Sequence, residues 1–258
     1  MVLITSSDNA RFRELLALAE SVRGRRQTGL ALLDGVHLVE SYIDQCGSPT
    51  SLVVSSSGRQ HAEVARLVAQ LADVPGIELS DALFRRLSPV QTPTGILATI
   101  PIPLRRAPSG DPEACVLLED VQDPGNLGSI LRSTAAAGIR QVCLSPQCAD
   151  LWSPKVLRAG MGAHFKLQCF AGVDLVAFTA AFPGRLIATH PDTPRTLFDA
   201  DLTGLIGLVF GNEGAGVSPA LLKQAAEVIR IPMPGGTESL NIAAAAAICL
   251  FERVRQLG

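Results

Sequence analysis

Several features that would assign a protein class directly are missing from the 258-residue sequence. Its six cysteines form no Cys-x-x-Cys pair, the spacing typical of zinc and thioredoxin-like redox sites. They are scattered through apolar segments, as is typical of reduced core residues in a cytosolic protein. The opening MVLITSSDNARFREL has no apolar signal core, and the run IAAAAAICLF near the end is far shorter than the ~20 residues of a membrane helix. We therefore expect a soluble, cytoplasmic protein without a membrane segment.

Lysine is also scarce, because three lysines stand against 19 arginines in a chain of net charge −2. That balance by itself neither favours nor excludes an anionic partner. Over the first 26 positions, however, arginines outnumber acidic residues; they are Arg11, Arg13, Arg23, Arg25 and Arg26. A guanidinium group can pair two phosphate oxygens at once. This segment is therefore either a phosphate contact or an ordinary solvated helix face.

The length of the chain exceeds the usual ~100–150 residues of one domain, which predicts two domains. The proline-rich stretch IPIPLRRAPSGDP, 100–112, has no helical or alternating pattern and is typical of an interdomain linker. We therefore predict domains at 1–105 and 112–258. The first domain is predicted to be a small α/β sandwich, with strands at 30–35, 51–56, 76–80 and 95–100 and helices at 62–71 and 81–88.

Beyond the linker, apolar strands alternate regularly with helices. We predict strands at 115–120, 141–145, 185–189, 205–211 and 227–232, and helices at 126–137, 155–165, 219–226 and 240–256. Such alternation predicts a parallel sheet covered by helices on both faces. Ligands of these sheets bind outside the carboxyl ends of the strands, so the loops after the strands are the candidate sites.

The first such loop is LEDVQDPGNLGSILRSTAAAG, 118–138. Its Asp-Pro pair predicts a turn, Asn126 can cap the next helix, and Gly128 permits close approach of another backbone. Arg132 follows in the second turn of the helix, among alanines. It is either a surface residue or a group aimed into a site.

The second loop, VFGNEGAGVS, has glycines spaced Gly-x-x-Gly-x-Gly. A dinucleotide site needs Gly-x-Gly-x-x-Gly and an acidic residue ~20 positions later, where this chain has Ile231. The Gly-Lys-Ser/Thr of a phosphate-binding P-loop does not occur either. The loop instead presents Asn212 and Glu213 just beyond a buried strand. There a charge is either paired or solvated.

The third loop, IRIPMPGGTESLNIAAAAAICLFE, again follows a predicted strand. Its prolines stiffen the chain directly after the strand, and its two glycines permit a bend. Ser239 can cap the C-terminal helix. The small side chains of that helix permit very close packing of backbone on backbone. This suits a tightly packed element or a subunit interface.

In this order, the three segments resemble the signature motifs of the SpoU family of RNA ribose 2′-O-methyltransferases, a branch of the SPOUT superfamily. The first motif, Asn-x-Gly-x-x-x-Arg, is matched by Asn126, Gly128 and Arg132. The second, Gly-Asn-Glu-x-x-Gly, is matched by Gly211, Asn212, Glu213 and Gly216. The third, Pro-x-x-Gly-x-x-x-Ser-Leu-Asn, is matched by Pro232, Gly235, Ser239, Leu240 and Asn241. The resemblance covers the chain from about Val116 onward, and the N-terminal part resembles more loosely an L30e-like substrate-binding domain.

This resemblance implies an α/β fold with a deep trefoil knot in the C-terminal domain. It also implies S-adenosylmethionine as methyl donor, held bent in the knotted loops largely by backbone groups. The implied cofactor-binding residues are Gly211, Asn212, Gly216, Ile231, Met233 and Leu240. True knots are almost absent from proteins, so the knot rests on the resemblance alone.

The resemblance further implies methyl transfer to a ribose 2′-hydroxyl of structured RNA. The two-domain build and the arginine-rich start favour ribosomal RNA over transfer RNA. The implied catalytic residues are Arg132, Asn126, Glu213, Ser239 and Asn241. A guanidinium group is a poor base because it keeps its proton in water. We therefore expect Arg132 to orient the hydroxyl and stabilise developing alkoxide, while the other four orient Arg132 and the ribose.

Family habit also implies a homodimer through the C-terminal domain. Three alternatives stay open: a transfer-RNA methyltransferase, a non-catalytic RNA-binding module with the same fold, and a nucleotide-dependent oxidoreductase.

Overall fold

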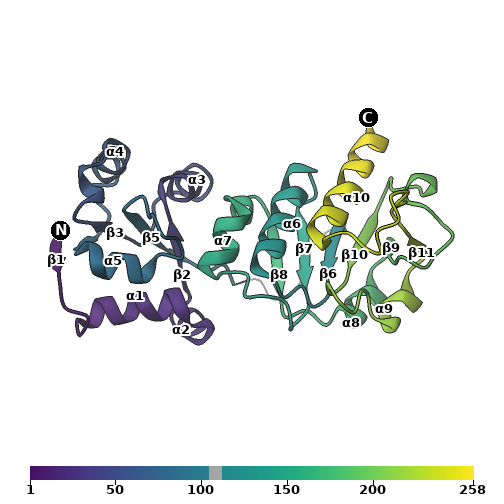
Figure 1. Ribbon diagram of the computed structural model, residues 1–258, viewed down its shortest axis with the longest axis horizontal. Helices are drawn as coiled ribbons and strands as arrows, with labels where there is room; N and C mark the ends of the chain where they lie inside the picture. Colours follow the sequence, from purple (N-terminus) through teal and green to yellow (C-terminus); the bar gives the residue numbers. More distant parts are fainter. Residues whose placement is uncertain (105–111) are drawn as a thin grey trace. The chain divides into compact units, whose positions relative to one another are not determined.

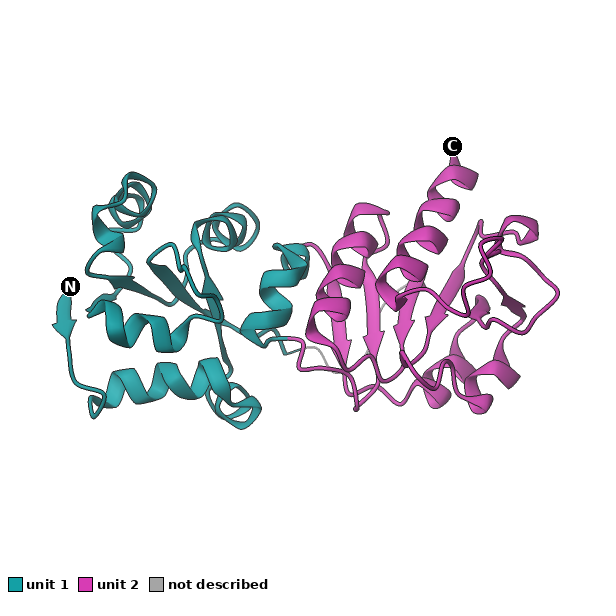
Figure 2. Ribbon diagram, viewed as in Figure 1, with its two compact units in different colours: residues 1–104, 152–165 teal, residues 105–151, 166–258 magenta. Residues whose placement is uncertain are grey.

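The computed structural model describes residues 1–104 and 112–258, so the predicted linker lies largely, at 105–111, outside the described residues. The chain divides into two compact units (Figure 2). Unit 1 consists of Met1–Leu104 together with Trp152–Phe165, and unit 2 contains the other described residues. The boundaries predicted from the sequence assign Trp152–Phe165 to the C-terminal domain, whereas its contacts place it in unit 1.

Within its described residues, unit 1 forms a mixed sheet of five strands in the order β1-β4-β3-β5-β2. The strands are β1 (Val2–Ile4), β2 (Leu30–Asp34), β3 (Ser51–Ser55), β4 (Gly76–Leu79) and β5 (Ile96–Pro101). Only β5 runs antiparallel to its neighbours among these described pairs. Because β5 extends to Pro101, the first two residues of the predicted linker belong to the sheet.

Helices cover both faces of the unit 1 sheet. On one face lie α1 (Ala10–Glu20), α2 (Val22–Thr28) and α5 (Asp81–Leu87). On the other lie α3 (Val36–Cys46) and α4 (Ala62–Gln70), the latter preceded by the short 3-10 turn Gly58–Gln60. Each face has its own apolar core, one built around Phe12 and Phe84 and the other around Val39 and Leu67. The sequence predicted α4, α5 and the strands β2 to β5, but not α1, α2, α3 or β1.

The segment Trp152–Phe165 joins the second of these cores. It contains α7 (Pro154–Gly160) and a 3-10 turn, Ala163–Phe165. Leu157 is fully buried in the core, and the Phe165 ring meets the Tyr42 ring edge-on, with centroids 5.2 Å apart. The single helix predicted at 155–165 is wrong, because Met161 and Gly162 both have positive φ and end α7.

Unit 2 has, within its described residues, a parallel sheet in the order β11-β9-β10-β6-β7-β8. Its strands are β6 (Cys115–Leu118), β7 (Gln141–Leu144), β8 (Gln168–Ala171), β9 (Arg185–Thr189), β10 (Ile206–Phe210) and β11 (Glu227–Ile229). Helices α6 (Pro124–Ala136) and α10 (Ile242–Leu257) lie side by side over one face, and α8 (Leu175–Ala181) and α9 (Pro219–Gln224) over the other (Figure 1). A short 3-10 turn, Leu197–Asp199, precedes β10.

The prediction of a parallel sheet with helices on both faces is confirmed. The central strands β6 and β10 are buried at every position, as expected where helices cover both faces. The short edge strand β8 and the helix α8 after it were not predicted. The structure gives the order of the strands, and the trefoil knot stays a prediction from the resemblance. Within the described ranges, no helix combines the length and apolar character needed to cross a membrane.

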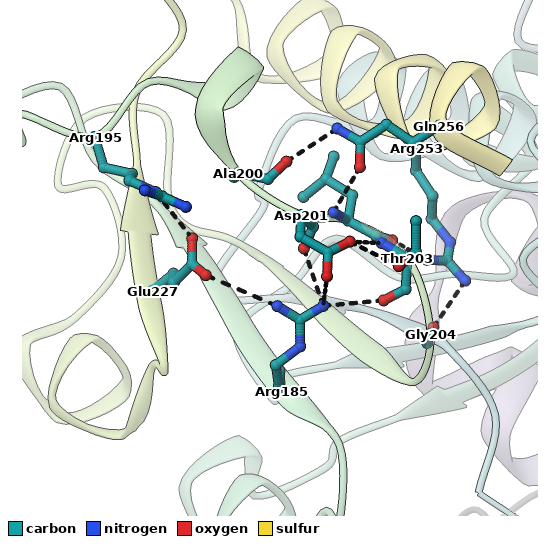
Figure 3. Close-up of polar contacts among 10 residues, drawn as sticks. Arg185, Arg195, Ala200, Asp201, Thr203, Gly204, Glu227, Arg253 and Gln256 are labelled. Carbon is teal, nitrogen blue, oxygen red and sulfur yellow. Dashed lines mark hydrogen bonds and ion pairs between the residues drawn. The ribbon is translucent and has the colours of Figure 1, made fainter.

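The C-terminal part of α10 is fixed to the loop before β10 by buried polar contacts (Figure 3). The Arg253 side chain is 8% exposed and donates to the carbonyl oxygens of Leu202 and Gly204. Gln256 accepts a hydrogen bond from the Leu202 N–H at 2.7 Å and donates to the Ala200 carbonyl at 3.0 Å. Burial lowers the pKa of Arg253 from its ordinary value. These contacts hold α10, and therefore the segment at its N-terminus, in place.

Around this anchor, arginines bind acidic residues of neighbouring segments. Arg185 lies 3.1 Å from Asp201 and 3.8 Å from Glu227, and Arg195 lies 3.3 Å from Glu227 (Figure 3). These pairs are partly exposed, so each contributes little free energy of folding. Together they connect β9 with the loop before β10, to which α10 is bound.

We expect Arg253→Ala to destabilise unit 2 by about 3 kcal/mol, because two buried carbonyl oxygens lose a charged donor. Thermal melting and hydrogen exchange along α10 measure this change. Arg140→Ala is the matched control in the same unit, since its exposed ion pair with Glu113 contributes less than about 1 kcal/mol. Equal effects of the two substitutions would contradict the anchoring role of Arg253.

Candidate active site

Two adjacent strands bring two of the predicted loops together. β6 and β10 pair in parallel, with Leu118 opposite Phe210, so the loops that follow them begin side by side. The Glu119 N–H donates to the Phe210 carbonyl at 2.9 Å, and the Glu119 carboxylate accepts from the Ser218 N–H at 2.7 Å. At the carboxyl edge of the sheet, the loops after β6 and β10 are therefore joined through Glu119.

Asp120 forms hydrogen bonds with the loop that follows β7. Its φ of 55° is in the left-handed region, which is unusual for a residue other than glycine. Its carboxylate accepts from the Ser145 hydroxyl at 2.5 Å, and its N–H donates to the same oxygen at 2.9 Å. Its carbonyl accepts from the Asn212 amide at 2.9 Å. Loops after β6, β7 and β10 thus converge on this residue.

The glycine-rich loop after β10 is a closed turn. Asn212 and Gly216 exchange two backbone hydrogen bonds, of 3.0 and 2.9 Å, and the Asn212 side chain accepts from the N–H groups of Gly214 and Ala215. A Cβ on Gly211 would lie 2.1 Å from the carbonyl carbon of Gly216, and Gly216 itself has φ +70°. The turn therefore needs glycine at both ends, and it exposes Glu213 at its tip.

A chain of side-chain hydrogen bonds joins all three predicted motifs. The Asn126 amide nitrogen donates to the Glu213 carboxylate at 3.1 Å. The Asn126 amide oxygen accepts from the Asn241 amide nitrogen at 2.8 Å. The Asn241 oxygen in turn accepts from the N–H groups of Ala243 and Ala244, at the start of α10. We call Glu213, Asn126 and Asn241 the amide cluster.

Both predicted helix caps are wrong by a few residues. Asp123, not Asn126, caps α6, because its side chain accepts from the Asn126 N–H and the helix begins at Pro124. Asn241, not Ser239, caps α10, which begins at Ile242 rather than at residue 240. The displaced cap leaves the Asn126 side chain available for the amide cluster.

Arg132 and Ser239 do not join the amide cluster. Arg132 lies on α6 with an exposed side chain, and its guanidinium makes no hydrogen bond or ion pair with any described residue. Six residues of helix place it about 120° around the helix from Asn126, on the exposed face that also carries Ser129 and Ala136. Ser239 is exposed in the loop before α10.

The predicted cofactor residues lie on two of the converging segments. Gly211, Asn212 and Gly216 form the closed turn. Ile231 and Met233 are half-buried beyond β11, and Leu240 is 38% exposed directly before Asn241. The site thus offers backbone groups, glycines with open space, such as Gly235, and apolar side chains at a polar edge. These features fit S-adenosylmethionine, whose adenine ring can pack on apolar side chains and whose polar groups can bind backbone.

One further loop at this edge received no candidate residue from the sequence. β9 lies between β10 and β11, and its last residue, Thr189, donates from its hydroxyl to the Val209 carbonyl at 3.4 Å. The next residue, His190, is half-buried and accepts from the Asp192 N–H through Nδ1 at 3.1 Å. The predicted strand at 185–189 was sufficient to point to this loop, because it ends at the same edge.

Comparison with known proteins gives a consistent result. Residues 113–251 match the SpoU rRNA Methylase family, and residues 9–98 match the MRM3-like substrate binding domain. An uncharacterized tRNA/rRNA methyltransferase of Synechocystis is 33% identical, over 98% of this chain and 93% of its own length. A 23S rRNA guanosine 2′-O-methyltransferase of Bacillus subtilis is 28% identical, over 97% of this chain and 98% of its own.

Solved structures agree over nearly the whole chain. The SpoU methyltransferase AviRb from Streptomyces viridochromogenes, in complex with its cofactor AdoMet, superposes with a TM-score of 0.85 at 29% identity, covering 96% of this chain and 98% of that one. The parallel sheet and the three loops joined at its edge define a SPOUT-type methyltransferase domain. More narrowly, the chain belongs to the SpoU rRNA methylase family.

We expect Gly211→Ala to weaken S-adenosylmethionine binding by more than about tenfold, because its Cβ would collide with the backbone of Gly216 and open the turn. Isothermal titration calorimetry measures the affinity. Gly214→Ala is the control in the same loop, since its Cβ meets only the Asn212 side chain, at 3.5 Å. If both variants bind as the wild type does, the turn is not part of the cofactor site.

Proposed function

We propose that this protein transfers the methyl group of S-adenosylmethionine to a ribose 2′-hydroxyl of ribosomal RNA. The observation that carries the proposal is the amide cluster, in which one residue from each of the three family motifs is hydrogen-bonded to the next. The cluster lies at the carboxyl edge of a parallel sheet, where such sheets bind ligands. The family and the cofactor-bound relative support the same reaction.

Ribosomal RNA is favoured over transfer RNA by the extent of the likeness. The ribosomal-RNA enzyme of Bacillus subtilis matches 97% of this chain, including unit 1. A tRNA-modifying TrmH/SpoU enzyme of A. aeolicus matches 57% of this chain, at a TM-score of 0.50. The relatives that match nearly the whole chain, and so share both units with this protein, include two named as 23S rRNA 2′-O-methyltransferases.

The reaction requires alignment more than activation. S-adenosylmethionine supplies a methyl group already activated on a sulfonium sulfur. The ribose oxygen must approach in line with the carbon–sulfur bond that breaks, and the hydroxyl proton must leave. Holding two reactants in this geometry accounts for a large part of such a rate enhancement. We assign that positioning to the amide cluster, together with Ser239.

Arg132 is the charged group that we assign to the ribose. Its guanidinium makes no hydrogen bond or ion pair within the described part of the chain, so it is available to a phosphate or a developing alkoxide. A guanidinium fork donates two parallel hydrogen bonds to such oxygens. In this role Arg132 orients the nucleotide and stabilises negative charge, and the proton passes to solvent.

We expect Arg132→Ala to lower kcat by about 100-fold or more, the usual loss when a donor to a developing oxyanion is removed. The affinity for S-adenosylmethionine should stay within about twofold, measured by calorimetry. Ser129→Ala, on the same exposed face of α6, is the control and should leave kcat unchanged.

Near-normal turnover by Arg132→Ala would remove Arg132 from the mechanism. If the wild-type protein gives no heat with S-adenosylmethionine, the proposed function fails and a non-catalytic RNA-binding module takes its place.

We also propose a homodimer formed through α10 and α6. The exposed side of α10 carries Ile248 and Phe251, which are 36% and 48% exposed, in line with Ala244. A contiguous apolar surface of this kind marks an interaction site. The neighbouring helix α6 presents small side chains, Ser129 and Ala136, on its exposed face, which permits close packing.

We expect Phe251→Glu to convert the dimer to a monomer in sedimentation velocity and to reduce methylation. The reason is that a carboxylate would be buried without a partner in the interface. Val176→Glu is the matched control, because Val176 is 40% exposed on α8, over the opposite face of the sheet. A wild-type protein that sediments as a fully active monomer would contradict the proposal.

The proposal includes a cytoplasmic location, which is where bacteria modify their ribosomal RNA. All six cysteines are free, and three of them, Cys115, Cys143 and Cys249, are buried. Burial raises the pKa of the Cys143 and Cys249 thiols to about 12, which keeps them protonated and unreactive. Thiols in this state suit a reducing compartment.

A further inference from the structure

Charge is distributed unevenly between the two helical layers of unit 1. The layer formed by α1, α2 and α5, here called the arginine layer, exposes Arg11, Arg13, Arg23, Arg26, Arg85 and Arg86. Its acidic residues are Asp8, Glu14, Glu20 and Asp81. The opposite layer, α3 and α4, carries Glu40, Asp44 and Glu63 against one arginine, Arg66, which is paired with Glu40. On the same side, α7 adds the exposed Lys155 and Arg158, so acidic and basic residues balance there and the net positive charge lies on the arginine layer.

Most guanidinium groups of the arginine layer are not neutralised. Arg13 pairs with Asp8 at 2.5 Å. In contrast, no ion pair or hydrogen bond engages the side chains of Arg23 and Arg26 within the ranges that the structure describes. The helix that carries them, VRGRRQT, contains no acidic residue. The strongest uncompensated charge of unit 1 therefore lies on α2.

Buried contacts with α1 fix the position of α2. Arg25 is 3% exposed and donates to the carbonyl oxygens of Leu18 and Ala19, at the end of α1. A Cβ on Gly24 would lie 2.6 Å from the Ala17 carbonyl oxygen, so glycine allows α2 to cross α1 closely. With Arg25 directed inward, Arg23 and Arg26 share the outer side at a spacing of three residues. Folding thus fixes the backbone that carries Arg23 and Arg26 before any ligand binds.

A second basic pair lies near the other end of α1. Arg85 and Arg86 close α5, and the Arg86 guanidinium lies over the Phe12 ring, 5.1 Å from its centroid. Phe12 belongs to the first turn of α1, whereas α2 follows its last turn. The 11 residues of α1 span about 16 Å. The two basic pairs therefore lie near opposite ends of α1, and a ligand that binds both must carry negative charge over a comparable length.

We propose that the arginine layer is the surface on which unit 1 holds the phosphate backbone of the RNA substrate, with Arg23 and Arg26 as its main contacts. The inference rests on the proposed function. RNA is favoured over an acidic protein because phosphates recur along the whole polymer and so reach both basic pairs. Structured RNA is bound mainly through its shape and backbone, which is what such a surface can read.

The test uses the full-length protein and large-subunit ribosomal RNA purified from cells that lack the gene. Filter binding over a series of KCl concentrations gives the slope of log K against log [KCl]. We expect Arg23→Ala/Arg26→Ala to make this slope shallower by about 1.5 and to weaken binding about tenfold. KM should rise by the same factor, with kcat and the affinity for S-adenosylmethionine within about twofold.

Two further variants separate contact from net charge and from folding. Arg59→Ala/Arg66→Ala removes the same charge from outside the layer, where both arginines are already paired with acids, and should leave slope and KM unchanged. Arg23→Lys/Arg26→Lys keeps the charge and should keep the slope. An unchanged slope in the alanine variant, or an equal loss in the control, overturns the proposal.

Two other outcomes have separate meanings. Displacement of the wild-type protein by polyglutamate as readily as by RNA overturns the proposal in favour of an acidic protein partner. If the wild type binds RNA but transfers no methyl group, the proposed function fails, while the binding data still decide whether the arginine layer contacts RNA.

Discussion

The hydrogen bonds of Asn126 to Glu213 and Asn241 are the constraint on which the site depends. An amide has one donor side and one acceptor side, and here each side has a partner of the complementary kind. The partners stand 87 and 115 residues later in the chain. Asn126 therefore aligns a helix start, a glycine turn and a second helix start with one side chain. An aspartate or a leucine of similar size can satisfy only one partner or neither.

The fold brings these partners within reach through backbone contacts. Parallel pairing of β6 and β10 makes their loops neighbours, and the absence of a Cβ at Gly211 lets the turn close on Gly216. Because the turn bonds mostly to itself, it holds its shape before any ligand arrives. A ligand bound there meets preorganised backbone groups and costs little reordering. The buried contacts of Arg253 likewise fix the position of α10. Asn241 is therefore positioned both by the helix that follows it and by its hydrogen bond to Asn126.

The sequence predicted what depends on periodicity and spacing. β6 and β10 are continuous apolar runs, and the motif residues Asn126, Glu213 and Asn241 do meet. The caps were misplaced because Asp123 and Asn241 can accept from backbone N–H groups as well as Asn126 and Ser239 can, and the choice depends on tertiary contacts. The same holds for the helix predicted at 155–165: the pattern indicates a helix, but nothing local shows that Leu157 packs in unit 1. β8 was missed because a four-residue edge strand carries little signal.

Arg132 raises a different question from the rest of the site. Its direction on α6 differs from that of Asn126 by about 120°, so the side chains of Arg132 and Asn126 point to different sides of the helix. Arg132 and the apolar residues Ile248 and Phe251 lie on exposed faces of two helices, α6 and α10, that pack side by side. If the proposed dimer extends from α10 onto the exposed face of α6, Arg132 lies at the boundary between two subunits rather than in open solvent. A guanidinium in such a partly enclosed position interacts more strongly with an anion than one in water. The catalytic role proposed for Arg132 and the proposed dimer therefore depend on each other.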